Sequence, residues 1–304
     1  MITINHAFAN VNNIRLRYAE AGKGDLVILL HGFPEFSYSW RHQLNALAPH
    51  FHAVAPDMRG ANLSDKPPRP EDYRIEYLVE DVVGLIDFFG ADKAAIVGHD
   101  WGASVAWAFA QKYPQRVSKL VALQVPPAPV WRANMTAKQL FRSWYMLFFQ
   151  LPGIPESLLS RNNYEAIRKV FKESVARKNS FSDEDVEKYV EAISRPGALT
   201  AALNYYRGNI RRLLARMNKR GAKDGLGHGR IRVPTLFIFG EKDTAIEPAT
   251  VANVRGFIDA PYFELRIPDS GHWVQNEAPT EVNEALLKFL TSETKVELVA
   301  SANG

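Results

Sequence analysis

The stretch AAIVGHDWGASVAWAFAQKYP, residues 94–114, decides the fold. Its first four residues are small or β-branched and predict a short buried strand, and from Ala103 onward apolar residues at helical spacing predict a helix. Between them lies GHDWG, residues 98–102, which has the form G-x-D-x-G. The related strand–turn–helix pattern G-x-S-x-G carries a nucleophilic serine at its centre. Asp100 is therefore a candidate nucleophile, and the question is which chemistry needs a carboxylate there.

The rest of the chain alternates predicted strands and helices, with one long interruption. Apolar runs predict strands at residues 13–21, 26–30, 52–56, 94–97, 119–123, 234–240 and 262–267. Helix-like segments without a strand fill the interruption, at residues 136–150, 155–178, 183–193 and 198–220, and a last helix is predicted at 279–291 before a loose polar tail. We expect an α/β fold with a mostly parallel central sheet, helices on both faces and an inserted all-helical cap. The expected core is residues 1–128 and 228–304, and the expected cap is residues 129–227.

Composition narrows the classes of function. The chain has 304 residues, 46% of them hydrophobic, and no cysteine, which excludes disulfides, thiolate nucleophiles and cysteine metal sites. No apolar stretch approaches the roughly 20 residues of a membrane helix, and the N-terminus resembles no secretory signal, so we expect a cytoplasmic protein without a membrane partner. The net charge of +4 is mild, and we interpret the basic run at residues 207–220 as a solvated helix face. A nucleic-acid partner is therefore not expected.

Four motifs follow one another in an informative order. LLHGFPE at residues 29–35 follows a predicted strand, and the GHDWG turn comes next. FGEKDTAIEP at 239–248 then places Asp243 just past a strand, and PDSGHWVQ at 268–275 places His272 just past the last one. Nucleophile, acid, histidine is the chain order of α/β hydrolases. The three side chains are thus expected to meet at the carboxyl edge of the sheet.

The same motifs resemble one family. HGFPE at 31–35, GHDWG at 98–102, SWYMLFFQLPGIPE at 143–156, LNYYRGN at 203–209, GEKD at 240–243 and SGHW at 270–273 are similar to soluble epoxide hydrolases, over about residues 13–290. The resemblance implies that two cap tyrosines, Tyr145 and Tyr206, reach over the nucleophile; Tyr205 is adjacent, which leaves a one-residue ambiguity. It also implies a cis Phe33-Pro34 bond and a role for Glu35 in positioning water. His99 we interpret as structural.

The chemistry of a carboxylate explains the aspartate. At a carbonyl a carboxylate gains only an anhydride, whereas at a saturated, strained carbon it can displace oxygen and form an alkyl ester. Water activated by His272 can then hydrolyse the ester, with the amides of Phe33 and Trp101 as the oxyanion hole and Asp243 orienting the imidazole. A tyrosine, protonated at neutral pH, can protonate the leaving oxygen.

The expected ligands are water and a small apolar epoxide. Candidate substrate-binding residues are Phe36, Trp101, Met146 and Phe149. No cofactor is expected, because the glycine turn lacks the G-x-G-x-x-G spacing, and no metal is implied. The oligomeric state is left as monomer or homodimer.

Two other classes of function remain as alternatives, the dehalogenases, of haloalkane or fluoroacetate type, and the non-catalytic binding modules. A haloalkane-type dehalogenase would use the same aspartate, but such enzymes place a halide donor, often Asn, where this chain has Phe33, which offers none. A fluoroacetate-type enzyme would be expected to carry arginines just after the nucleophile, and here Trp101, Gly102, Ala103 and Ser104 follow. A non-catalytic binding module would be expected to have lost at least one of the triad residues, all of which are present.

Overall fold

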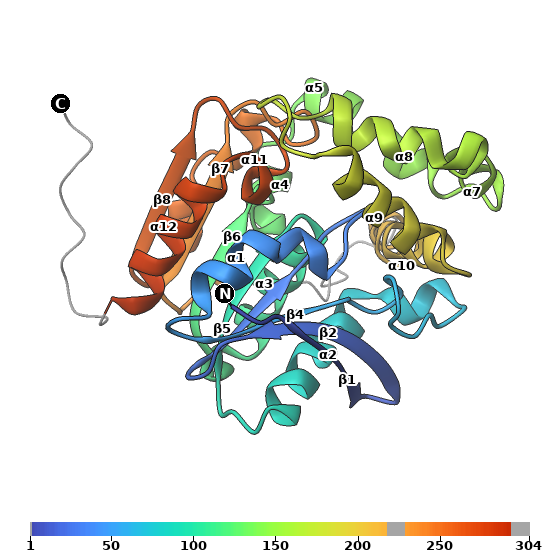
Figure 1. Cartoon of the computed structure of the whole chain (residues 1–304). Coiled ribbons are helices and arrows are strands. Elements are labelled where there is room, and N and C mark those ends of the chain that lie inside the picture. The colour runs from blue at the N-terminus through green and yellow to red at the C-terminus, as the bar shows by residue number, and fades with distance from the viewer. Residues whose placement is uncertain (1, 218–228, 293–304) are drawn as a thin grey trace.

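The computed structural model describes residues 2–217 and 229–292 of the chain, with side chains described up to residue 210 before the gap. Figure 1 shows a twisted sheet with helices on both faces and a group of helices lying over one edge of it. The mostly parallel α/β sheet expected from the sequence is confirmed.

Eight strands form the sheet, in the order β1-β2-β4-β3-β5-β6-β7-β8. They are β1 (Asn5–Val11), β2 (Ile14–Ala21), β3 (Leu26–Leu30), β4 (His52–Pro56), β5 (Ala94–His99), β6 (Val117–Leu123), β7 (Thr235–Gly240) and β8 (Tyr262–Ile267). β2 is antiparallel to β1 and β4, and the other pairs are parallel. Seven of the eight strands were predicted; β1 was not.

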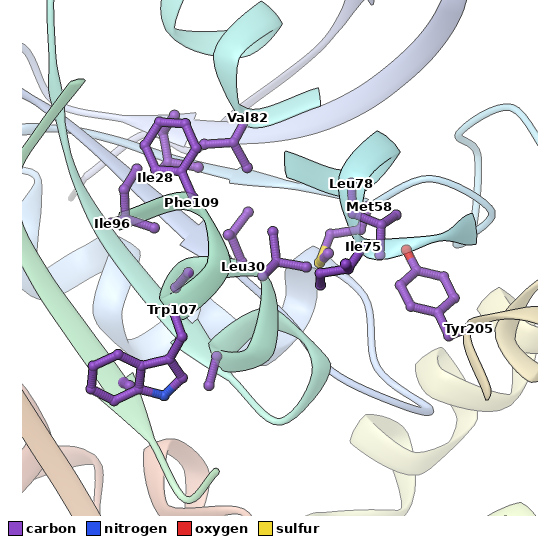
Figure 2. Packing of buried hydrophobic residues seen from close by; sticks show 14 of the residues in the cluster. Ile28, Leu30, Met58, Ile75, Leu78, Val82, Ile96, Trp107, Phe109 and Tyr205 are labelled. Carbon is purple, nitrogen blue, oxygen red and sulfur yellow. The ribbon is translucent and has the colours of Figure 1, made fainter. Parts of the chain in front are cut away.

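Successive residues of the central strands face opposite layers, which gives two hydrophobic cores. Val27 and Leu29 of β3 pack with the residues of α1 (Arg41–Leu47) and α12 (Pro279–Thr291) on one face. Ile28 and Leu30 pack on the other face with α2 (Ile75–Phe88) and α3 (Trp101–Lys112). Figure 2 shows this second core, with Ile28 and Leu30 among the side chains of β5, α2 and α3. Because both faces are covered, the central strands are almost continuously apolar.

Only helices lie between β6 and β7 in the described part of that segment. They are α4 (Ala128–Ala133), α5 (Ala137–Arg142), α6 (Trp144–Phe148), α7 (Ile154–Leu159), α8 (Arg161–Glu173), α9 (Asp183–Ser194) and α10 (Ala198–Met217). The remaining elements are α11 (Val274–Glu277) and the 3₁₀ helices η1 (Ser37–Trp40), η2 (Pro70–Tyr73), η3 (Pro114–Arg116), η4 (Pro248–Val251) and η5 (Val254–Phe257).

Two of the helices predicted in this segment differ from the structure, and the end of a third lies outside the described residues. The helix predicted at 136–150 is divided at Ser143 into α5 and α6. The helix predicted at 155–178 is broken by a left-handed run at residues 162–164, where φ is 49°, 56° and 61°, and ends at Glu173. The last three residues of the helix predicted at 198–220 lie outside the described residues, as does the tail from residue 293.

The prediction of a solvated basic face is wrong at its first residue. Arg207 is buried, with its guanidinium bound to both carboxylate oxygens of Glu156 and to the carbonyl oxygens of Phe149 and Leu151. The side chains from residue 211 onward are outside the described part. Arg207 joins α10 to the segment that carries α6 and α7.

Candidate active site

The turn between β5 and α3 presents Asp100 at the carboxyl edge of the sheet. Its backbone has φ 51° and ψ −117°, an unfavourable conformation for a residue with a side chain. Gly98 and Gly102 make the turn possible: a Cβ at Gly98 would lie 2.3 Å from the Gly102 carbonyl oxygen, and one at Gly102 would lie 2.0 Å from that of Leu30. Both glycines of the G-x-D-x-G pattern are therefore required by close backbone packing.

The loop after β3 holds one oxygen of this carboxylate. The Phe33 amide donates to Asp100 Oδ1 at 2.9 Å. Gly32 leaves space for the aspartate, since a Cβ there would lie 2.4 Å from Asp100 Cβ. The Phe33-Pro34 peptide bond is cis, as the sequence resemblance implied. Trp101 is the first residue of α3, so its amide has no partner within the helix.

Asp100, His272 and Asp243 lie next to one another in this order. His272 Nε2 lies 3.8 Å from Asp100 Oδ2, and His272 Nδ1 donates to Asp243 Oδ2 at 2.8 Å. The other oxygen of Asp243 accepts from the amides of Ala245 and Ile246 at 2.7 and 2.8 Å. These bonds fix the buried carboxylate, and it in turn fixes the imidazole with Nε2 toward Asp100.

The charges around His272 determine its protonation. Burial alone would lower its pKa, but Asp243, by charge and hydrogen bond, and the charges of Asp100 and Glu35 outweigh burial and raise the pKa to about 9. At neutral pH the imidazole is therefore protonated. Removing the Asp100 charge would remove one of the groups that hold this proton.

Two tyrosines from α6 and α10 face each other in the site. The rings of Tyr145 and Tyr206 are 5.9 Å apart, and the hydroxyl of Tyr206 has hydrogen bonds with Tyr145 and with the Trp101 side chain. Burial, together with the nearby Asp100 charge, raises the pKa of both hydroxyls well above the usual value. Both hydroxyls therefore carry their protons at neutral pH.

Tyr205 is placed differently from its neighbour. Its hydroxyl donates to the Arg59 carbonyl oxygen at 2.8 Å, and its ring lies 5.7 Å from that of Trp101. Figure 2 shows it beside Met58 and Ile75 at the end of the second core. Of the two adjacent tyrosines, Tyr206 is the one beside Tyr145.

Comparison with known proteins identifies the family. Residues 25–279 match the family model described as alpha/beta hydrolase fold. The chain is 36% identical over 301 residues to epoxide hydrolase 4 of Mus musculus, an alignment that covers 95% of this chain and 80% of the mouse protein. The chain belongs to the epoxide hydrolase family of α/β hydrolases.

Other members of this epoxide hydrolase family align over nearly their whole length. Epoxide hydrolase A of Mycobacterium tuberculosis is 37% identical over 318 residues, with 93% of this chain and 96% of that protein covered. A crystal structure of a variant epoxide hydrolase from Bacillus megaterium superposes with a TM-score of 0.84 at 31% identity, covering 94% of this chain and 100% of that one. The helical segment between β6 and β7 lies within these matched lengths.

Each carboxylate oxygen of Glu35 accepts two hydrogen bonds. Its Oε1 accepts from Ser39 and Gln275, and its Oε2 accepts from the Gly32 amide and from His99 Nδ1 at 2.7 Å. Burial would raise its pKa, but the charge and hydrogen bond of His99, with the other donors, lower it to about 2. With four donors already bound, Glu35 has no free in-plane acceptor position for a water molecule.

His99 connects this carboxylate to the triad histidine. Its Nε2 lies 2.8 Å from the carbonyl oxygen of His272, which can only accept, so Nε2 carries a hydrogen. His99 was expected to be structural, and here it supports both the backbone of His272 and the side chain of Glu35.

A cavity lies beside Trp101, the residue after Asp100, between the loop that follows β3 and helices α9 and α10, and Asp100 itself does not line it. Phe33, Trp101 and Glu35 are among its lining residues, and the walls that the sequence did not suggest come from the loop after β4 and from α9 and α10: Met58, Gly60, Ala61, Asn62, Ala192, Ile193, Ala198, Ala202 and Tyr205. The polar side chain of Asn62 is already bound to Asp57 and Arg195. This space therefore favours an uncharged, apolar group. Of these walls, only the loop after β4 could have been predicted, because β4 is a parallel strand like those that precede Asp100, Asp243 and His272.

The predicted substrate-binding residues separate into two groups. Phe149 packs against Phe33, Tyr145 and Tyr206 with ring centroids 5.7, 5.4 and 5.1 Å apart, and so borders the site. Trp101 lines the cavity, and Met146 is half-buried on α6. Phe36 instead packs on Tyr38 and Tyr189 and lines a separate hollow near β1 and α9.

Proposed function

We propose that this protein converts an apolar epoxide to a vicinal diol through a covalent ester on Asp100. One observation carries the proposal: the Asp100 carboxylate lies near two tyrosine hydroxyls that keep their protons, with the Tyr206 ring 5.1 Å from that of Trp101 and 5.9 Å from that of Tyr145. Such a pair can attack a strained carbon on one side and protonate its oxygen on the other. The names of the relatives, which are epoxide hydrolases, support the same reaction.

In the first step Asp100 Oδ2 attacks an epoxide carbon. Oδ1 is held by the Phe33 amide, which leaves Oδ2 as the attacking atom. The carbon–oxygen bond of the ring breaks as Tyr145 or Tyr206 gives its proton to the leaving oxygen. The product is an alkyl ester with Oδ1 as its carbonyl oxygen.

The second step is hydrolysis of that ester. Once Asp100 is esterified its charge is lost, which favours a neutral His272 that can take a proton from water. Water attacks Asp100 Cγ, and the Phe33 and Trp101 amides hold the oxyanion on Oδ1. His272 then gives the proton that it took from water to the departing diol oxygen. The proton that His272 held in the resting protein restores the tyrosine, and the proton of the regenerated Asp100 carboxyl returns to His272.

The helices between β6 and β7 would form the cap of this enzyme. We propose the division into a core of residues 1–128 and 228–304 and a cap of residues 129–227. The positions of Tyr145 on α6 and Tyr206 on α10 support it, because both tyrosines come from this segment while the triad comes from loops that follow strands.

Oxygen tracing tests the covalent step. In a single turnover with excess enzyme in heavy-oxygen water, we expect an unlabelled diol and label on Asp100, since the delivered oxygen comes from the protein. His272→Gln should accumulate an adduct on Asp100, visible by intact mass, because alkylation needs no base and hydrolysis does. A labelled diol in the first turnover, with no adduct in the variant, would contradict the proposal. Haloalkanes assayed in parallel test the dehalogenase alternative.

The tyrosine assignment has a matched control in the chain. Tyr145→Phe and Tyr206→Phe should each weaken epoxide turnover, and the double variant should lose about 10²–10⁴-fold or more, because only the acid is removed. Tyr205→Phe removes a hydroxyl of the same helix that is bound to the Arg59 carbonyl, and should retain most activity. Diol formation by all four proteins is the measurement; near-normal activity of the double variant would remove the tyrosines from the mechanism.

A further inference from the structure

A hollow lies next to the cavity beside Trp101, and the two differ greatly in size. The hollow has a volume of about 410 Å³, whereas the cavity has a volume of about 30 Å³. Small-molecule pockets typically measure about 300–1,000 Å³, and about 10–15 Å³ holds one water molecule. The hollow is therefore large enough for a small molecule, whereas the cavity accepts roughly two water-sized groups.

Three segments of the chain separate these two spaces. They are residues 34–36 after β3, residues 61–63 after β4 and residues 191–193 of α9, and in each segment one end lines the cavity and the other end lines the hollow. Two residues, Asn62 and Ala192, line both spaces. At these two positions the partition is one residue thick.

Asn62 supplies the longer of the two side chains in this thin part of the partition, since the side chain of Ala192 ends at Cβ. The Asn62 side chain is held from both sides: Nδ2 donates to Asp57 Oδ2 at 2.8 Å, and Oδ1 accepts from Arg195 Nε at 2.8 Å. The backbone of Asn62 has φ 43°, in the left-handed region. These contacts keep the side chain between the two spaces.

The two contacts of Asn62 differ in how firmly they hold it. Asp57 is completely buried, whereas the side chain of Arg195 is 34% exposed in the loop between α9 and α10 and also binds Glu191. Water can replace Asn62 as a partner of a partly exposed guanidinium at little cost, but it cannot do so at a buried carboxylate. The bond from Arg195 is therefore the contact of the barrier that opens more easily.

The charges of the hollow favour an uncharged occupant. The four lysine and arginine side chains that line it, Arg17, Arg41, Lys188 and Arg195, are each in an ion pair with a carboxylate. An anionic ligand would have to compete with these carboxylates, whereas an alkyl chain would not. Apolar side chains, among them Leu44 and Leu63, supply surface for such a chain.

We propose that Asn62 and Arg195 determine the length of the epoxide substituent that the site accepts. This inference rests on the proposed reaction at Asp100. Phe33 and Trp101, which flank that carboxylate, line the cavity, so a substituent on the bound epoxide extends into it. While Asn62 stays in place only a short group fits. When Asn62 is displaced, the cavity and the hollow become one passage, and a long unbranched alkyl chain reaches the hollow.

Two terminal epoxides of different length, epoxybutane and epoxydodecane, test this passage. Asn62→Gly should raise the ratio of kcat/KM for epoxydodecane to that for epoxybutane by about tenfold or more, because several methylene groups gain an apolar site. Glycine accepts the left-handed backbone at this position. Arg195→Met should raise the same ratio by a smaller factor, since Asn62 keeps its bond to Asp57.

Each variant has a matched control. Asn179 is exposed in the loop between α8 and α9 and has φ 66°, so Asn179→Gly controls for the change of backbone. Arg168→Met removes a comparable ion pair, with Glu187 on the surface of α9. Both should leave the ratio unchanged. Adding Leu63→Trp to Asn62→Gly should reverse most of the gain, because the larger side chain occupies the hollow.

Binding of the diol products gives a readout that needs no turnover. By calorimetry, Asn62→Gly should bind dodecanediol about tenfold more tightly than the wild type and butanediol equally well. If none of the proteins hydrolyses either epoxide, the proposed reaction fails and the diol affinities alone decide whether the passage exists. Circular dichroism establishes that each variant is folded, and Arg195→Met decides if Asn62→Gly is not. An unchanged ratio of kcat/KM, or an unchanged dodecanediol affinity, in a folded variant overturns the proposal.

Discussion

At the scale of single residues, the candidate site depends on where its protons are held. Asp100, Asp243 and Glu35 all act on His272, which raises its pKa to about 9 despite complete burial. In the resting protein the imidazole is therefore an acid. It becomes available as a base only when a neighbouring charge is removed, and esterification of Asp100 is the event that removes one. The order of the two proposed steps thus follows from the electrostatics of the resting site.

This raised pKa predicts a pH dependence of stability. His272 has an ordinary pKa of 6.5 in the unfolded chain and about 9 in the folded one, so its contribution is complete below pH 6.5 and is lost as the pH rises through 9. The free energy of unfolding should fall by up to a few kcal/mol across this window, on the scale of about 1.4 kcal/mol per pKa unit. Urea unfolding at several pH values measures it.

His272→Gln is the variant that isolates the effect. The difference in unfolding free energy between wild type and His272→Gln should decrease between pH 6.5 and 9, because the variant has no imidazole to titrate. A constant difference across the window would show that the His272 proton is not held by its neighbours.

The sequence was most informative about residues whose backbone position is fixed by a strand end. Asp100, Asp243 and His272 each follow a parallel strand, and the structure brings them together. Phe36 packs on Tyr38 and Tyr189 and lines a separate hollow, and its role in substrate binding stays a prediction. The four hydrogen bonds to Glu35 could not be predicted either, since two of the donors, His99 and Gln275, come from distant parts of the chain.

At the scale of secondary-structure elements, the helical segment shows where sequence periodicity fails. Spacing of apolar residues predicted long helices at 136–150 and 155–178, and each is two shorter ones. Neither break has a proline or glycine at it: Ser143 leaves the helix at φ −87° and ψ 7°, and asparagines take the left-handed conformation at 162 and 163. Asparagine tolerates that conformation better than most residues, but it also occurs within helices, so the break could not be predicted.

Arg207 makes the arrangement of these short helices testable. Its four hydrogen bonds join α10 to Phe149, Leu151 and Glu156, and so set the position of α6 and Tyr145 relative to Tyr206. Arg207→Met should reduce epoxide turnover by about tenfold or more and lower the unfolding free energy by roughly 1–3 kcal/mol, because buried acceptors lose their partner.

The control is an ion pair that does not reach the site. Arg168 on α8 binds Glu187 at the surface, and Arg168→Met should leave turnover unchanged and stability within about 1 kcal/mol. Steady-state kinetics and thermal unfolding of both variants are the measurements. Equal losses in the two variants would mean that Arg207 does not position α6.

At the scale of the whole molecule, the sheet is closed by contacts between segments far apart in sequence. Lys119 on β6 donates through Nζ to the carbonyl oxygens of Phe289, Leu290 and Ser292, at the C-terminal end of α12. The overall arrangement was predictable because parallel strands and their crossover helices leave few choices of topology. The strand β1 could not be predicted, since its residues alternate weakly and β2 is its only strand partner among the described residues.

Lys119→Met should separate stability from activity. Three helix-end carbonyls would lose their donor, which should cost about 1–3 kcal/mol of unfolding free energy. The substitution lies at the opposite end of β6 from Leu123, away from Asp100, so turnover at low temperature should be unchanged. Calorimetry and a diol assay of the same preparation measure both, and loss of activity at full stability would contradict this division.

The strand order also has a consequence for how the chain is made. β6 is complete at Leu123, but its neighbour β7 begins only at Thr235, after every helix from α4 to α10. During synthesis on the ribosome, β6 is therefore the open edge of a half-built, apolar sheet for the whole time that the intervening residues are added. Such an edge can pair with other nascent chains. We expect yield in a cell to depend on translation speed across residues 124–234 and on chaperones that cover that edge, more than on the stability of the finished protein.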